Sequence, residues 1–206
     1  ITDDSMSLAA GNGLQVNTSG KLTVQPYGNN FTSLTYPITD FAVSSDVSGL
    51  TIGKDLGSTA HTDTVTIAGT TSIAGPINVY ADTINVNSNL NTSGGGAAGD
   101  VLLKASGSIT QASNVSVTTN GGEVNYWADS DGTNGGFVWF KAGSSVRTTT
   151  AANITVSGGN VADLTALAAS GNATGMTTTM GNGVTLDAVS LSSYGGNITV
   201  RGNEIT

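Results

Sequence analysis

The chain has 206 residues, of which 37% are hydrophobic, 10% are charged and none is cysteine, so it has no disulfide scaffold and no thiolate site. Six basic residues against fourteen acidic ones give a net charge of -8, which argues against binding to nucleic acid or to an anionic membrane surface. No apolar run approaches the roughly 20 residues of a membrane helix, so we expect no membrane insertion.

Short apolar-polar-apolar triplets recur along the chain, a pattern typical of strands with one buried face. They span residues 14–16, 22–24, 41–43, 50–52, 65–67, 77–79, 84–86, 101–103, 115–117, 124–126, 154–156, 184–186, 189–191 and 198–200. Single apolar residues, Ile73, Ile109 and Val146, fill some of the gaps, and glycine-rich turns separate the triplets.

A triplet buries only two side chains on one face, which is too little for an isolated sheet. Stacked coils solve this problem, because each short strand pairs with its equivalents in the coils above and below. We therefore predict an all-β fold, a parallel β-helix (β-solenoid) with irregular coils and loop insertions. Two or three strands per coil give coils of roughly 20 to 25 residues, and hence about eight to ten coils.

Three segments repeat one plan of small residues, a turn and then a triplet: 119–126, 150–156 and 193–200. The first two are offset by about 30 residues and the last two by about 44, so we expect the coils to vary in length.

Two segments fit the pattern less well. Residues 25–48 contain Pro26 and Pro37 and could form a capping hairpin or a loop packed over the solenoid. In residues 161–183, apolar residues at i, i+3 and i+6 from Val161 also allow a short helix. We divide the chain into residues 1–48, as N-terminal coils or a capping or loop region, and residues 49–206, as one continuous β-helix repeat region.

The candidate site is the stretch YWADSDGTNGGFVWF, residues 126–140. Asp129 and Asp131 resemble the start of a calcium loop, because calcium takes carboxylate oxygens, although the third acidic position and the distal glutamate are missing. A plain loop, in which Asp and Asn bond their own backbone, is the alternative. Strand alternation places Tyr126 inward and Trp127 outward.

The aromatic residues of this stretch allow two interpretations. They could pack inside the coil or shield a sheet edge. They could instead form a carbohydrate-binding surface, in which exposed tryptophans stack on a sugar ring while neighbouring side chains bond its hydroxyls. The candidate ligand-binding residues are Trp127, Asp129, Asp131, Asn134 and Trp139.

Catalytic signals are weak. The carboxylates are scattered, and no Ser-His-Asp arrangement or phosphate-binding loop is evident. His61 lies in a polar segment and is expected to be a solvated loop residue. We therefore expect no enzymatic activity; a polysaccharide-active β-helix enzyme is the least favoured alternative.

Several stretches resemble one family. GLTIGK (49–54), TSIAGPINVY (71–80), INVNSNL (84–90), LKASGSIT (103–110) and GGNITVRG (195–202) are similar to units in the passenger regions of filamentous-haemagglutinin-like exoproteins of Gram-negative bacteria. The resemblance covers roughly residues 49–206. It implies a right-handed β-helix, secretion to the cell surface and a role in adhesion, aggregation or biofilm formation. The Asn-Pro-Asn motifs of that family are absent.

The sequence thus supports a structural or adhesive segment of a secreted bacterial surface protein, a rigid stalk or filament subunit. Because the chain begins without Met and ends within its own pattern, we interpret it as a piece of a longer protein. The expected partners are further repeats of the same chain or copies of it placed end to end, and a host or matrix glycan. The main alternative is a carbohydrate-binding adhesin module. No cofactor is expected, apart from the calcium considered above.

Overall fold

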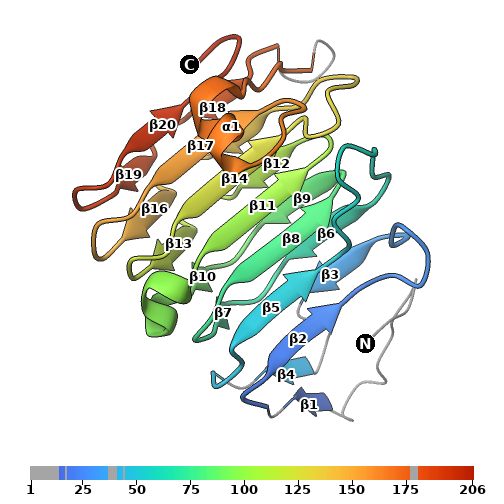
Figure 1. Cartoon of the computed structure of the whole chain (residues 1–206), viewed down its shortest axis with the longest axis vertical. Coiled ribbons are helices and arrows are strands. Elements are labelled where there is room, and N and C mark those ends of the chain that lie inside the picture. Colours follow the sequence, from blue (N-terminus) through green and yellow to red (C-terminus); the bar gives the residue numbers. More distant parts are fainter. Residues whose placement is uncertain (1–13, 17, 37–40, 44, 177–180) are drawn as a thin grey trace.

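The structure, a computed structural model, describes residues 14–16, 18–36, 41–43, 45–176 and 181–206. The regular elements of the described chain are almost all short strands, and most of these lie in three parallel sheets in which every third strand returns to the same sheet (Figure 1). This is the architecture of a parallel β-helix, so the predicted fold class is confirmed.

The first sheet contains seven strands: β2 (Lys21–Val24), β5 (Gly49–Ile52), β8 (Ile77–Ala81), β11 (Val101–Ala105), β14 (Val124–Ala128), β17 (Ile154–Gly158) and β20 (Ile198–Val200). The second contains six: β3 (Leu34–Tyr36), β6 (Thr64–Ile67), β9 (Thr83–Val86), β12 (Ile109–Gln111), β15 (Val138–Phe140) and β18 (Val184–Leu186). The third contains five: β7 (Thr71–Ser72), β10 (Leu90–Asn91), β13 (Ser116–Thr119), β16 (Ser145–Thr148) and β19 (Ser190–Ser192). A separate pair joins β1 (Leu14–Val16) to β4 (Phe41–Val43), and two helices complete the described elements, the 3-10 helix η1 (Ser93–Ala98) and α1 (Leu164–Ser170).

All of the predicted triplets overlap strands. The repeated plan noted in the sequence is also a true repeat, because Val124 pairs with Ile154, and Ile154 with Ile198, in neighbouring strands of the first sheet. The predicted variation in coil length is confirmed, but the predicted length of 20 to 25 residues holds for only some of the coils. Val101 pairs with Val124, 23 residues on, but Ile154 pairs with Ile198, 44 residues on. Each coil uses three strands, and long insertions at the corners leave fewer coils than predicted.

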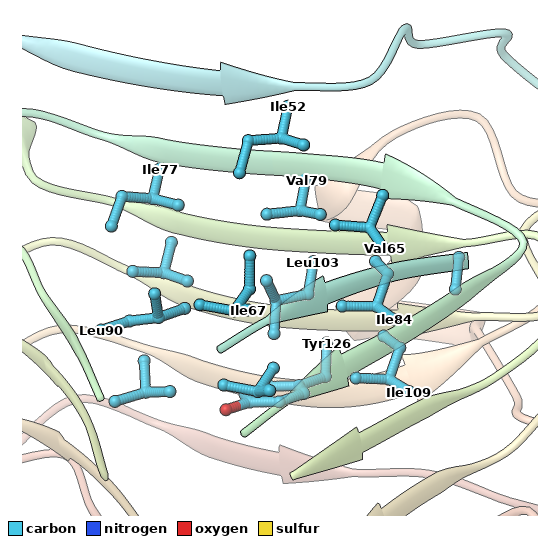
Figure 2. Close-up of a cluster of buried hydrophobic side chains, with 14 of the residues drawn as sticks. Ile52, Val65, Ile67, Ile77, Val79, Ile84, Leu90, Leu103, Ile109 and Tyr126 are labelled. Carbon is cyan, nitrogen blue, oxygen red and sulfur yellow. The ribbon is translucent and has the colours of Figure 1, made fainter. Parts of the chain in front are cut away.

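The interior is built from ladders of in-register apolar side chains. Figure 2 shows Ile77, Leu103 and their neighbours stacked between the sheets. Some ladder positions are polar, and Gln111 is one of them: the Tyr126 hydroxyl donates to Gln111 Oε1, and Gln111 Nε2 donates to the carbonyl oxygens of Val115 at 2.7 Å and Ser145 at 3.1 Å. Tyr126 is fully buried, as its inward position in the strand predicts, and burial raises its pKa.

Stacked coils also explain the abundance of glycine. At the corner between the third and first sheets, a Cβ on Gly122 would lie 2.3 Å from the carbonyl oxygen of Gly99 in the preceding coil. A Cβ on Gly196 would lie 2.1 Å from that of Ala152, and one on Gly75 would lie 1.7 Å from that of Ser48. The turns of successive coils are therefore too close for a side chain at these positions.

The two segments that fit the sequence pattern less well, 25–48 and 161–183, contain different elements. Parts of residues 25–48 form β3 and β4, and β2 pairs with β5, so strands on both sides of residue 49 belong to one sheet. The pairing of β3 with β6 is parallel, unlike that of a hairpin. The second segment contains the helix α1, capped by Asp163, whose Oδ1 accepts from the Ala166 N–H at 2.8 Å. No helix among the described residues is long and apolar enough to cross a membrane.

We expect Gly122→Val to lower the free energy of unfolding by roughly 1–3 kcal/mol, because the new side chain forces the corners of two coils apart. Chemical denaturation followed by circular dichroism measures the effect. Gly181→Ala is the matched control, since nothing lies within 4 Å of a Cβ at that position. Equal stability of Gly122→Val and wild type would show that the corner has room for a side chain.

Candidate functional site

The loop of residues 129–136 connects the first sheet to the second. Asp131 Oδ1 accepts from the Thr133 N–H at 3.1 Å, and Gly132 and Gly135 adopt positive φ of 70° and 74°. The loop is also held to its neighbours: the Asp129 N–H donates to the Gly107 carbonyl oxygen below it at 2.9 Å. These are the backbone-satisfying contacts expected of a plain loop.

Asp129 has the most unusual environment in this loop. It is 2% exposed and adopts a φ of +53°, and its Oδ2 accepts a hydrogen bond from the Thr174 hydroxyl at 2.6 Å. Its Oδ1 is buried and has no hydrogen-bond partner among the described residues. Burial raises the pKa of the Asp129 carboxyl, the Thr174 bond opposes that rise, and the nearby Asp131 carboxylate adds to it. The net effect is a pKa above the ordinary value of 3.8.

The loop offers calcium few ligands. Both carboxylate oxygens of Asp131 accept from Thr133, one from its N–H and one from its hydroxyl. Across the described residues, no group of three or more His, Asp or Glu side chains could hold a metal ion together. Asp129 and Asp131 are the two acidic residues of this loop, whereas calcium takes six to eight oxygen ligands. Calcium binding stays a prediction.

The two tryptophans face outward from different sheets, Trp127 from β14 in the first and Trp139 from β15 in the second. Trp127 is only 5% exposed: its Nε1 donates to the Gly159 carbonyl oxygen at 2.8 Å, and Lys104 Nζ lies 4.7 Å from its ring centroid. Trp139 is half-buried, with Lys141 Nζ 4.7 Å from its ring centroid. Of the two, Trp139 is the one that solvent reaches, and Asn134 is exposed at the loop.

The prediction of a solvated His61 is wrong. The residue is 7% exposed, and its Nδ1 lies 3.1 Å from Asn30 Oδ1 and 3.5 Å from Asp63 Oδ1. The segment that connects β5 to β6 folds back against the coils. The His61 N–H therefore donates to Ser106 Oγ, two coils further on, at 2.9 Å. His61 therefore stabilises a corner of the coil through hydrogen bonds to neighbouring segments.

A groove on the outer face of the first sheet is a second candidate site, and sequence reasoning missed it. Its volume is about 240 Å³. Helix α1 lies over β17 (Figure 1), and its residues form one wall of the groove. The lining residues come from β14, β17 and β20, from the residues just before these strands, and from α1: Glu123, Asn125, Asn153, Thr155, Leu164, Thr165, Ala168, Asn197 and Thr199. They span more than 70 positions of the sequence and meet because β14, β17 and β20 are neighbouring strands.

No protein-family model, curated protein or solved structure matched the chain. Neither a family nor a relative therefore supplies a function for it.

We expect Asp129→Asn to be more stable than wild type at neutral pH. Because the pKa of Asp129 is raised in the folded state, its contribution to stability is fully present below the ordinary Asp pKa of 3.8 and is lost as pH rises through the raised value. The advantage of the variant should therefore shrink as pH falls. Urea unfolding at a series of pH values measures it, with exposed Asp187→Asn as the control for removal of one charge. A pH-independent difference would contradict the raised pKa.

Proposed function

We propose that this chain is a structural and adhesive segment of a secreted bacterial surface protein of the filamentous-haemagglutinin-like kind. The observation that supports the proposal is the unbroken parallel register of the first sheet from β2 to β20. Seven strands at a spacing of about 4.8 Å make a rod roughly 30 Å long, with main-chain hydrogen bonds between all of its coils. Such a rod is suited to hold a binding surface away from a cell.

The proposal includes partners at the end of the rod. Ile198 and Val200 occupy interior ladder positions of the last strand of the first sheet, opposite Ile154 and Val156. Ile198 is 44% exposed, and Val200, with Leu191 of the third sheet, is only partly buried. Further coils of the same chain, or a second copy placed end to end, would cover these side chains and pair with the free edge of β20.

A carbohydrate-binding adhesin is the second candidate function. At the predicted loop, half-buried Trp139 lies in register between Thr110 and Thr185 on the outer face of the second sheet, so an aromatic ring has hydroxyl neighbours there.

We also propose that the chain has no catalytic activity. Glu123 is the single carboxylate in the lining of the groove, whereas glycoside hydrolysis commonly uses a pair.

We expect beads coated with the chain to adhere to host cells or extracellular matrix several-fold more than beads coated with Ile109→Asp. That substitution places a charge at a fully buried position and disrupts the solenoid. Counting bound beads by microscopy measures adhesion. Thr66→Asp, at an outward-facing residue of the same sheet two strands from Thr110, is the control and should adhere like wild type. Equal adhesion of wild type and Ile109→Asp would remove the adhesive role of the folded rod.

For end-to-end contact, we expect the chain to associate as its concentration rises and Ile198→Glu to stay monomeric, because a charge then occupies the exposed end of the interior. Sedimentation velocity over a concentration series distinguishes these states. Thr110→Glu, on the side of the rod, should associate like wild type. A wild-type chain that is monomeric at all concentrations would contradict self-assembly through this end.

A further inference from the structure

We propose that the groove between helix α1 and the outer face of the first sheet binds a neutral saccharide. The inference deepens the proposed function and rests on it only for the cell-surface setting in which glycans would be met. The binding site differs from the predicted tryptophan and aspartate loop, and its floor is made of strand residues.

The floor of the groove carries nearly buried residues whose polar groups open onto the groove. Asn125 and Thr155 are each 4% exposed and sit side by side, paired in register on β14 and β17. No hydrogen bond joins the Asn125 amide or the Thr155 hydroxyl to any described residue, and both side chains line the groove. Thr199, next in register on β20, continues the row. A row of donors and acceptors is thus left open toward the groove.

Other buried polar side chains in this chain are of two kinds: Ser144 and Ser157 have hydroxyls without a partner among the described residues, whereas Gln111 and Thr119 are bonded within the chain. Gln111 donates to the carbonyl oxygens of Val115 and Ser145, and the Thr119 hydroxyl donates to that of Gly122 at 2.6 Å. No atom of Asn125 or Thr155 is among the fully buried polar atoms without a partner, so both side chains reach the solvent of the groove. A ligand that displaces water from them has to replace its hydrogen bonds, which is the physical reason to expect a hydrogen-bonding ligand here.

The rim of the groove is already ordered. Asn153 Nδ2 donates to Glu123 Oε1 at 2.9 Å, while Asn153 Oδ1 accepts from the Asn197 N–H at 3.0 Å. The Glu123 N–H in turn donates to Asp100 Oδ1 at 2.7 Å. These bonds hold two side chains at the rim in fixed positions before any ligand arrives, which reduces the entropy cost of binding.

The helical wall adds apolar surface. Leu167 is fully buried and anchors α1, and the wall of the groove is formed by Leu164, Thr165 and Ala168. A floor of amides and hydroxyls facing an apolar wall matches a sugar ring, whose hydroxyl groups project from its edge and whose faces carry C–H bonds. Pockets for drug-sized ligands are commonly about 300–1,000 Å³. At about 240 Å³, this groove suits one or two sugar units of a glycan.

The charge of the groove lining favours neutral saccharides over acidic ones. The lining contains one carboxylate, Glu123, and no Lys, Arg or His, and the chain carries a net charge of -8. An acidic sugar would meet repulsion and no counter-charge, so the ligand is neutral. A peptide is less suited, because extended peptides bind at free sheet edges, and the floor here is the face of a sheet.

The test is a glycan array that presents neutral and acidic glycans, followed by titration calorimetry with the strongest neutral hit. We expect neutral glycans to bind, and Asn125→Leu and Thr155→Val each to weaken binding about tenfold or more by removing a buried hydrogen-bonding group. Ala168→Phe should block the groove from the wall while leaving the floor intact. Asn78→Leu is the matched control: Asn78 lies in the same outward row, two strands away and outside the groove, and its replacement should leave affinity unchanged.

Circular dichroism and thermal unfolding check that each variant is folded, and Ala168→Phe keeps the test valid if a floor variant is not. Absence of binding to any neutral glycan, a preference for acidic glycans or unchanged affinity in a folded Ala168→Phe would each overturn the inference. Loss of binding in Trp139→Ala with full binding in the groove variants would move the site to the loop. A negative array with positive bead adhesion would overturn the groove and leave the proposed function standing.

Discussion

Successive coils of this chain lie one strand spacing, about 4.8 Å, apart, and main-chain hydrogen bonds tie each coil to the coil before and the coil after it. This spacing is the constraint on which the rest of the structure depends. Inside, it places like side chains in ladders, such as Leu103 beside Tyr126 and Val79. At the corners, it brings one turn onto the next, so Gly75, Gly122 and Gly196 stand where a Cβ would meet a carbonyl oxygen.

The same spacing organises the outer surface. Asn125, Thr155 and Thr199 form a polar row because strand pairing holds them in register, and not because any one of them is unusual. Where a long insertion folds back, part of the outer face becomes interior. Trp127 lies beneath Gly159, and Lys104 lies beside that ring with its Nζ 2.8 Å from Asp55 of another insertion. Strand pairing therefore sets the position of each outward-facing side chain, and the insertions determine which of these side chains are exposed to water.

Much of the rod could be predicted from the sequence. Burial of alternate residues produces the triplets, and the repeated plan at 124–126, 154–156 and 198–200 matches the pairing of β14, β17 and β20. Strands with fewer apolar residues were harder to recognise: Thr71–Ser72 and Leu90–Asn91 have only two residues each. Their place is determined by the coils on either side, which local sequence does not reveal.

The sites were less predictable for the same reason. The inward position of Tyr126 and the outward position of Trp127 follow from alternation, but the cover over Trp127 comes from a segment that begins more than thirty residues later. The groove combines residues from 123 to 199, each of them ordinary in its own segment. Which of these residues meet in the groove depends on the length of every coil between them, and local sequence patterns do not reveal that length.

The variation in coil length has an evolutionary consequence. A single residue, Asp82, connects β8 to β9, whereas residues 159–183 connect β17 to β18 at the equivalent corner, yet the strands on either side keep their register. Because the register tolerates insertions of such different lengths, selection can add, enlarge or delete a surface feature at one corner without redesigning the hydrophobic interior. The scaffold is therefore modular, and new recognition surfaces such as the helix-walled groove can arise by changes confined to one connection.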